Sequence, residues 1–341
     1  MEFMTSIDLR NLPVPVKYGD KIMLVGSCFT EHIGNSLGEL RFDVMQNPNG
    51  ILFDPASVCQ SLLSYIDNRE LTAADFFQLN EVWNSWAHHS RFSHIDRDTA
   101  VMQANASQAA AAAFIREADW LVVTLGSAFS YRLLRDQVVA GIFTGGTSAY
   151  LPVANNHRAP SGWFSKQLLE ISDIITMLDT CYYRLRLLNP KLKILFTVSP
   201  VRHLRDGVVD NNRSKARLIE SIHHMTGKFD NLYYFPAYEL VIDVLRDYRF
   251  FDTDFAHPNY AATSFVLEKF AESCIDPASR LLMSEIKKIS IARKHRALQP
   301  ATMAHQRFLQ AHYEKAVELQ QRYPFLDLSE DITYFKNNTA S

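Results

Sequence analysis

Residues 21–30 read KIMLVGSCFT, and this stretch decides the fold. Its apolar run 22–25 includes β-branched residues and is typical of a buried parallel strand. The run enters a glycine directly, and apolar residues then recur at helical spacing over 31–40. A strand that turns over a glycine into a helix carries Ser27 and Cys28 to the carboxyl end of a sheet, which is the edge where open α/β folds bind ligands.

Composition narrows the class of protein. The chain has 341 residues, 47% of them hydrophobic, so it can bury one large core or two smaller ones. A formal net charge of −2 gives no electrostatic reason to expect a nucleic-acid partner. The first twenty residues lack the pattern of a signal peptide, and no apolar run is long enough to cross a bilayer. We therefore expect a cytoplasmic protein without membrane insertion.

The four cysteines indicate reduced thiols. They are far apart and show no CxxC spacing, so neither a disulfide framework nor a zinc site is expected. Their positions are Cys28, Cys59, Cys181 and Cys274.

Apolar runs and helical patterns alternate along most of the chain. Five strands are predicted, at 22–25, 42–46, 120–125, 193–198 and 232–235. Strands that alternate with helices favour a doubly wound, flavodoxin-like α/β fold with a five-stranded parallel sheet and right-handed crossovers. We expect this α/β domain over 1–275, with an irregular insertion at about 67–100 after the second strand, and a helical C-terminal extension over 276–341. One long helix is predicted over 164–188, and a hairpin from 131–134 and 138–142.

Polar side chains follow most of these strands and would meet at one edge of the sheet. In chain order they are Ser27 and Cys28, then Asn49 and Gly50, then Gly126 and Ser127, then Ser199, Arg202 and His203, and finally Asp254 and His257.

Asp254 and His257 have the spacing of an acid and a base. A carboxylate three residues before a histidine, in a loop ahead of a helix, can fix the imidazole tautomer while the other ring nitrogen faces a nucleophile. The spacing also fits a turn-capping aspartate followed by a solvated histidine, and on spacing alone this second interpretation is the commoner one.

Together these segments resemble the SGNH (GDSL-type) hydrolase superfamily, in which a first-strand GDS turn bears the nucleophile and a late DxxH bears the acid and base. More specifically the chain resembles the GSCFA family, whose motif stands here as GSCFT, with Thr30 in place of alanine. Further family-like segments are NPNG at 47–50, VANNH at 153–157, TVSPVRH at 197–203, SK at 214–215, YFPAYE at 234–239, LRDYRF at 245–250 and DFAHP at 254–258.

The resemblance implies an SGNH-like fold and a nucleophile in the first turn. Aligned with GDSLT, the stretch puts Cys28 on the nucleophile and Ser27 on the aspartate. A thiol at a helix N-terminus beside a histidine can have a lowered pKa and attack as a thiolate. Ser27 is the nucleophile if the turn is shifted by one residue. The structural alternative is a buried Cys28 and an N-capping Ser27.

The expected oxyanion site departs from the superfamily. Its third strand normally ends in GxND, but GSAF stands here, with alanine for the asparagine at position 128. Asn155 is the candidate substitute, beside the backbone N–H groups of Cys28 and Gly50. Asn155 can equally stabilise its own loop.

Other polar residues remain open. His88, His89 and His94 lack a metal-binding spacing and are expected to be solvated or hydrogen-bonded. Arg202, His203 and Arg205 can bind an anionic or sugar group, or can be a solvated loop. Lys215 is either an active-site cation or a surface lysine.

The resemblance implies an esterase or acyltransferase that forms a covalent acyl-enzyme on a small acyl ester, possibly an O-acetylated carbohydrate. His257 would activate Cys28, and Asp254 would orient His257. No metal or organic cofactor is implied, and the oligomeric state is open. The rival from another class is a binding protein that keeps the fold without catalysis, and a third reading is redox sensing by Cys28.

Overall fold

A five-stranded parallel sheet forms the centre of the computed structural model, which describes residues 5–134 and 152–339. Its strands are β1 (Lys21–Gly26), β2 (Asp43–Gln46), β5 (Trp120–Leu125), β8 (Lys193–Val198) and β9 (Leu232–Tyr234). They lie in the order β2-β1-β5-β8-β9, and every neighbouring pair is parallel. The predicted doubly wound, flavodoxin-like sheet is confirmed.

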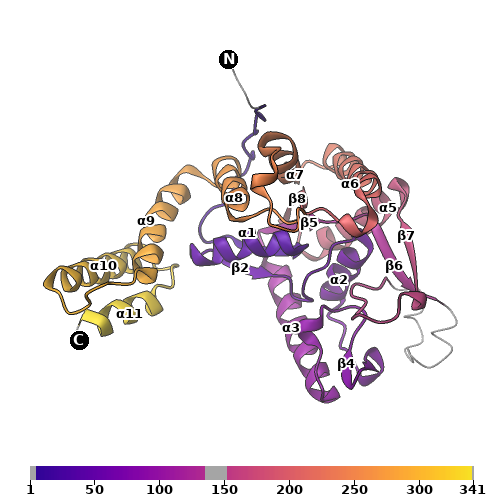
Figure 1. The fold of residues 1–341 in the computed structure, drawn as a ribbon, viewed down its shortest axis with the longest axis horizontal. Helices are drawn as coiled ribbons and strands as arrows, with labels where there is room; N and C mark the ends of the chain where they lie inside the picture. The colour runs from indigo at the N-terminus through magenta and orange to yellow at the C-terminus, as the bar shows by residue number, and fades with distance from the viewer. Residues whose placement is uncertain (1–4, 135–151, 340–341) are drawn as a thin grey trace.

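Helices cover both faces of this sheet (Figure 1). The α-helices of the described residues, of which the last three lie away from the sheet, are α1 (Cys28–Glu39), α2 (Pro55–Asp67), α3 (Arg97–Glu117), α5 (Ile171–Leu188), α6 (Val208–Lys228), α7 (Ala237–Glu239), α8 (Tyr260–Cys274), α9 (Pro277–Lys294), α10 (Met303–Arg322) and α11 (Ser329–Thr339). A π-helix, η7 (Leu240–Leu245), continues α7. Short 3-10 helices are η1 (Ala73–Asp75), η2 (Ser90–Phe92), η5 (Ser161–Trp163), η6 (Leu204–Asp206) and η8 (Tyr248–Phe250).

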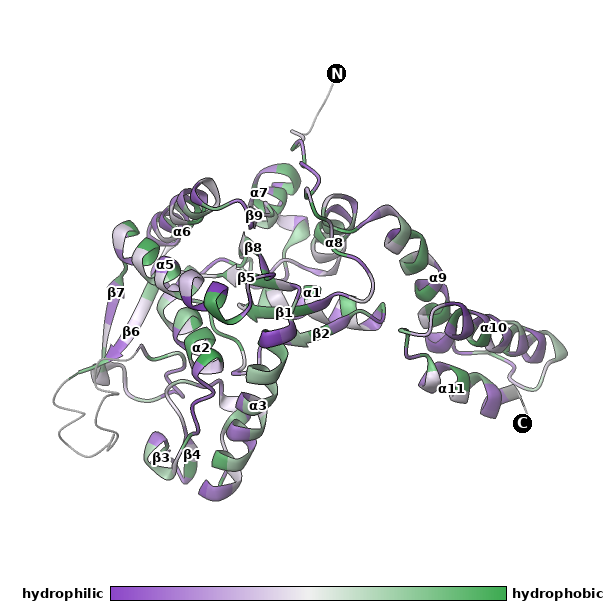
Figure 2. Ribbon diagram, turned by 180° about the vertical axis from the view of Figure 1, so that it is seen from behind, coloured by the Kyte–Doolittle hydropathy of each residue, from purple (hydrophilic) through white to green (hydrophobic). Residues whose placement is uncertain are grey.

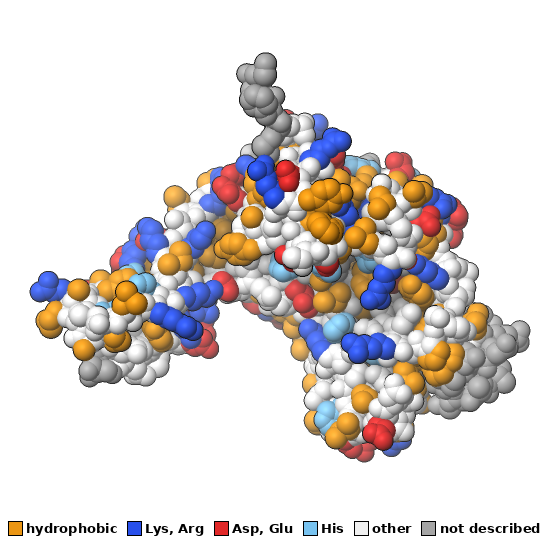
Figure 3. Space-filling view, viewed as in Figure 1, with side chains coloured by type: hydrophobic (Ala, Val, Ile, Leu, Met, Phe, Trp, Pro, Cys, Tyr) orange, Lys and Arg blue, Asp and Glu red, His pale blue; other side chains and the backbone are white. Residues whose placement is uncertain are grey.

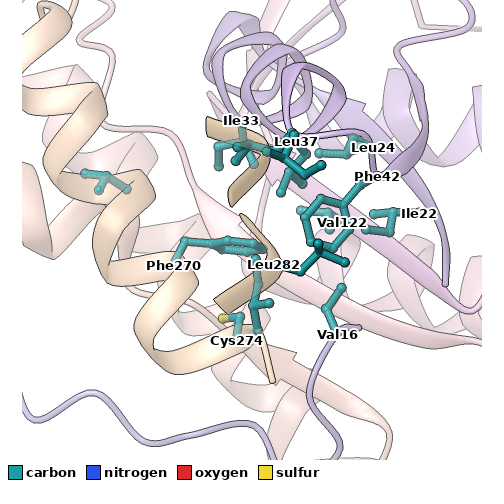
Figure 4. Packing of buried hydrophobic residues seen from close by; sticks show 14 of the residues in the cluster. Val16, Ile22, Leu24, Ile33, Leu37, Phe42, Val122, Phe270, Cys274 and Leu282 are labelled. Carbon is teal, nitrogen blue, oxygen red and sulfur yellow. The ribbon is translucent and has the colours of Figure 1, made fainter. Parts of the chain in front are cut away.

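The alternation of side chains along the strands divides the core in two. In β1, Ile22 and Leu24 join the hydrophobic cluster that includes α1 and α8, whereas Met23 and Val25 join the cluster that includes α2, α5 and α6. Figure 4 shows Ile22 and Leu24 with Val122 of β5, packed against residues of α1 and α8. A strand buried on both sides needs apolar residues at every position, which is why this segment reads as an unbroken apolar run.

Two smaller antiparallel sheets lie outside the central one. β3 (Phe77–Leu79) pairs with β4 (Val82–Asn84) within the predicted insertion, and β6 (Phe129–Leu133) pairs with β7 (Phe164–Leu168). The predicted single helix over 164–188 is therefore wrong at its start, because residues 164–168 form β7 and only α5 is helical. The predicted hairpin partner at 138–142 lies outside the described residues.

The C-terminal helices α9, α10 and α11 project from the α/β body (Figures 1 and 3). Their buried residues belong to the same hydrophobic cluster as those of α1. Arg41 pairs with Asp331, and Lys294 pairs with Glu39 at 2.9 Å, so both pairs tie the extension to the end of α1 and the turn after it. The division into two domains at about residue 275 stays a prediction.

Hydrophilic and hydrophobic residues alternate along the helices, as Figure 2 shows for α3 and α6. Over residues 5–134 and 152–339, no helix combines the length and apolar character that a membrane crossing requires.

Candidate active site

The turn between β1 and α1 gives Ser27 and Cys28 different roles. Ser27 is buried, and its Oγ caps α1 by accepting a hydrogen bond from the Phe29 N–H at 3.3 Å. Cys28 is the first residue of α1 and is partly exposed. This arrangement favours Cys28 as the reactive side chain, because Ser27 is engaged as an N-cap.

The loop that follows β2 is hydrogen-bonded to this turn. The Gly26 N–H donates to Asn47 Oδ1 at 2.9 Å, and the Gly26 carbonyl accepts from the Leu52 N–H at 3.0 Å. Gly26 has φ +147°, and a Cβ there would lie 2.2 Å from the Thr124 carbonyl oxygen. Glycine is therefore required where the turn passes against β5.

Asn49 and Gly50 lie in that same loop, but Gly50 is not a free oxyanion donor. Its N–H donates to the Asn47 carbonyl at 2.7 Å, which corrects the expectation that this amide faces the substrate. Asn49 is buried, and its N–H donates to the Tyr65 hydroxyl at 3.2 Å. Its Oδ1 has no hydrogen-bond partner among the described residues.

Gly126 and Ser127, which follow β5, are engaged in the same way. Both N–H groups donate to the Phe53 carbonyl, at 2.7 and 3.0 Å. Ser127 Oγ lies 3.2 Å from Ser214 Oγ, which in turn accepts from the Ala128 N–H at 2.7 Å. These residues join the carboxyl end of β5 to α6 and to the loop before α2, and they leave no backbone donor free at Gly126 or Ser127.

Lys215, whose role the sequence left open, is buried at the same edge of the sheet. Its side chain is 1% exposed, and Nζ donates to the Gly126 carbonyl at 2.5 Å and to the Ser199 carbonyl at 2.6 Å. Lys215 lies three residues before Leu218 and seven before Ile222, on the buried face of α6. That helical periodicity is the sequence signal that places Lys215 inside the protein.

The surroundings of Cys28 act on its thiol in opposite directions. Burial raises the pKa of the Cys28 thiol, and the charge of Glu31 raises it further. The Phe29 N–H at the helix N-terminus and the charge of Lys215 lower it. Burial has the largest effect, so on balance the pKa of the Cys28 thiol is raised above its usual value.

Asp254 and His257 form the predicted pair. Asp254 Oδ2 lies 2.6 Å from His257 Nδ1, and Oδ1 accepts from the N–H groups of Ala256 and His257 at 2.9 and 3.0 Å. These hydrogen bonds, that from the His257 N–H first, hold the pKa of the Asp254 carboxyl well below its usual range. No hydrogen bond joins Cys28 to His257 among the described residues; catalytic hydrogen bonds often tighten only when substrate binds.

Arg202 and His203 lie between this pair and the turn of Ser27 and Cys28. The Arg202 N–H donates to the Ala256 carbonyl at 3.0 Å, which joins the loop after β8 to the Asp254–His257 loop. A Cβ added at Gly126 would lie 3.5 Å from His203 Nε2, so this imidazole reaches the end of β5. Burial, then the charge of Lys215, lowers the pKa of His203 to about 4.

The Arg202 guanidinium lies over two aromatic rings. Its distance is 4.3 Å to the ring centroid of Phe251 and 5.7 Å to that of Tyr248. Cation–π contact with both rings makes Arg202 more than a solvated loop residue. Arg205, in contrast, is exposed.

Asn155 stabilises its own loop. Its Oδ1 accepts from the His157 N–H at 2.8 Å, and its N–H donates to the Trp86 carbonyl at 3.4 Å. No hydrogen bond of Asn155 Nδ2 is present among the described residues. The amide group is thus oriented by its oxygen and keeps its two N–H donors for another partner.

The histidines at 88, 89 and 94 do not form a metal site. No group of three or more metal-ligating side chains is found in the part of the chain that the structure describes. His88 is buried, with Nδ1 3.0 Å from Ser85 Oγ. The N–H of His89 donates to the Asn49 carbonyl at 2.9 Å, which places the insertion beside the loop after β2.

The burial of His88 leads us to expect a loss of stability in mild acid. Burial lowers its pKa to about 4, whereas an unfolded histidine titrates near 6.5. Between these values the unfolded chain binds the proton and the folded one does not, so the free energy of unfolding decreases as the pH falls from about 6.5 to about 4. From pH 7 to pH 5 we expect His88 to contribute a loss of about 2 kcal/mol.

Urea unfolding of the wild type and of His88→Gln at both pH values measures this contribution. The variant is expected to lose about 2 kcal/mol less than the wild type over that interval. An equal loss in the two proteins contradicts the assignment.

The fold and the site together define an α/β protein in which Ser27 and Cys28 form the turn after the first strand, and comparison with known families identifies its own. The sequence model of the GSCFA family matches residues 21–270, and that of the GSCFA domain protein, C-terminal domain, matches residues 286–340. The chain belongs to the GSCFA family.

Solved structures that match include the crystal structure of a carbohydrate esterase family 3 from Talaromyces cellulolyticus. It is 11% identical, with a TM-score of 0.33, and the match covers 79% of this chain and 99% of that chain. No curated protein matches the chain.

Proposed function

We propose that the protein is an SGNH-like esterase or acyltransferase that acts on a small acyl ester through a covalent acyl-enzyme on Cys28. One observation carries the proposal. Cys28 begins α1 at the carboxyl edge of the sheet, where Lys215 lies buried and where the loop of the Asp254–His257 pair joins the loop that ends in His203. No cofactor is needed for this chemistry.

In the first step His257, oriented by Asp254, takes the proton of the Cys28 thiol. The sulfur attacks the acyl carbon, a C–S bond forms, and the carbonyl electron pair moves onto oxygen. The oxyanion is held by the Cys28 N–H and by Asn155 Nδ2. When the C–O bond breaks, His257 returns its proton to the leaving alcohol. Water or an acceptor hydroxyl then attacks the thioester, and the thiol is regenerated.

The substrate class is proposed on fold-level analogy. The superfamily favours small acyl groups, and an acetyl group on a carbohydrate hydroxyl is the case that we put first. Arg202 and His203, at the edge of the site, are the residues that we assign to substrate contact beside the acyl group.

A binding protein that keeps the fold is the second candidate, and one observation favours it. The amides of Gly50, Gly126 and Ser127 are already hydrogen-bonded within the protein, and alanine stands at position 128. Removal of one oxyanion donor costs about a hundredfold to a thousandfold in rate, so catalysis depends on the donors that remain.

Intact mass after incubation with a small activated acyl ester tests the proposal. We expect a single acyl adduct on the wild type, its persistence in Ser27→Ala, and its loss in His257→Ala. Cys28→Ser is expected to change the lability of the adduct, because an oxygen ester replaces a thioester. The Asp254–His257 pair is expected to activate the Cys28 thiol and to carry no acyl group itself.

An unmodified wild type whose Cys28 has ordinary thiol reactivity would contradict acyl transfer and favour the binding protein. A low thiol pKa without any adduct would favour redox sensing.

A further inference from the structure

The buried ammonium of Lys215 has no carboxylate partner. None of the ion pairs formed by the described residues includes it. Its two hydrogen bonds go to the backbone carbonyls of Gly126 and Ser199, and its third N–H has no partner among the described residues. A charge that is removed from water is costly unless it is paired, so an unpaired buried lysine calls for an explanation.

Cys28 is the charged partner that the geometry offers. Both of the carbonyls that bind Lys215 Nζ follow the carboxyl ends of strands, β5 and β8, and the nucleophile turn lies at the same edge. A Cβ at Gly126 would lie 3.3 Å from Ser27 Cβ, so the carbonyl that holds Nζ belongs to a residue in contact with this turn. The ammonium is thus held by the backbone next to Cys28.

The other groups that face these two side chains are few. Glu31 acts on Cys28 from the same helix. The ring of Tyr238 lies 5.9 Å from Lys215 Nζ, and His203 faces Lys215 from the loop after β8. A negative charge on Cys28 raises the pKa of Lys215, which burial lowers to about 7. Because the interaction is mutual, the ammonium favours the thiolate by the same free energy.

We propose that Lys215 is the charge partner of the nucleophile: its ammonium, held by the Gly126 and Ser199 carbonyls, pairs with the Cys28 thiolate. Lys215 acts through Cys28 and is a positioning residue. When the thiol ionises, the S–H bond breaks, its electron pair stays on sulfur, and the proton passes to His257 or to solvent. The inference rests on the proposed function only in taking Cys28 as the reactive group.

The inference also gives the site a source of positive charge where the superfamily has an asparagine. Lys215 Nζ is bound to the carbonyl of Gly126, which is the glycine of the segment that replaces GxND. A buried cation that is already held at this point stabilises negative charge at the turn, and no water has to reorganise when that charge forms.

The pH dependence of iodoacetamide alkylation tests the pair without any substrate. The other three cysteines are buried, and subtraction of the Cys28→Ala background isolates the Cys28 signal. In Lys215→Met and in Lys215→Gln the thiol pKa is expected to rise by at least about one unit, which slows alkylation at pH 7 about tenfold. Lys215→Gln keeps N–H donors near the two carbonyls, so it serves if the methionine variant does not fold.

Ser214→Ala is the matched control, because Ser214 Oγ supports the same loop through the Ala128 N–H but carries no charge. The pKa of the Cys28 thiol in Ser214→Ala is expected to equal that in the wild type. An unchanged pKa in a folded neutral variant of Lys215 overturns the inference, and so does an equal rise in Ser214→Ala. A Lys215-dependent thiol pKa in a protein that forms no acyl adduct would contradict the proposed function and leave the charge pair supported.

Discussion

Replacement of Cys28 by alanine is expected to lower kcat/KM toward an activated acyl ester by at least about a thousandfold. The residue that forms the covalent bond acts as a unit with its base, so its removal leaves only the contribution of binding and of the oxyanion donors. Initial rates of the wild type and of Cys28→Ala with the same ester give this ratio. Circular dichroism of both proteins shows whether the fold is kept.

Ser27→Ala separates the two candidate nucleophiles. Ser27 Oγ accepts from the Phe29 N–H as the N-cap of α1, so its loss should lower the free energy of unfolding by about 1 kcal/mol. Its turnover is expected to stay within about tenfold of the wild type, because a small shift of the turn moves the thiol only slightly. A reversed outcome, with Ser27→Ala inactive and Cys28→Ala active, would assign the nucleophile to Ser27.

The central sheet could be predicted because its signal is local. Four of the five strands are short, mostly apolar runs, whereas β2 reads DVMQ. The alternation of strands with helices predicts a parallel sheet with its carboxyl ends at one edge. The spacing of Asp254 and His257 in the loop before α8 also predicted their side-chain hydrogen bond, which is observed at 2.6 Å.

The segment 164–168 could not be predicted, because its structure depends on a distant partner. FSKQL has no strong strand signal, yet it pairs antiparallel with β6. Phe164 packs edge-on to Trp86 and to Tyr131, with ring centroids 5.5 and 6.4 Å apart. Contacts of this kind override local preference, and the pattern of apolar residues does not reveal them.

The hydrogen bonds made by the expected oxyanion donors could not be predicted from the sequence either. Nothing in the sequence NPNG says that the Gly50 N–H closes a turn onto the Asn47 carbonyl. Sequence reasoning can place a residue at the sheet edge, but the use of its backbone N–H depends on the loop conformation. Lys215 differs, since helical periodicity already places it on the buried face of α6.

The largest effect on stability is expected at Gly26. In Gly26→Ala the new Cβ would lie 2.2 Å from the Thr124 carbonyl oxygen of the neighbouring strand, at a φ of +147° that alanine rarely adopts. Strain and overpacking together are expected to lower the free energy of unfolding by at least about 3 kcal/mol, a large part of a typical domain's stability. Urea unfolding measures this loss where the variant is soluble, and loss of the folded protein on expression agrees with it.

Gly38→Ala is the matched control within the same unit. Gly38 lies inside α1, and a Cβ there would meet Val44 Cγ2 at 3.5 Å, which is ordinary contact. Alanine is the better helix former, so this variant is expected to gain about 0.5–1 kcal/mol. Equal stabilities of Gly26→Ala and Gly38→Ala would contradict the close approach of the turn to β5. This close approach brings Cys28 to the sheet edge, so the glycine at position 26 also determines where the Cys28 thiol lies.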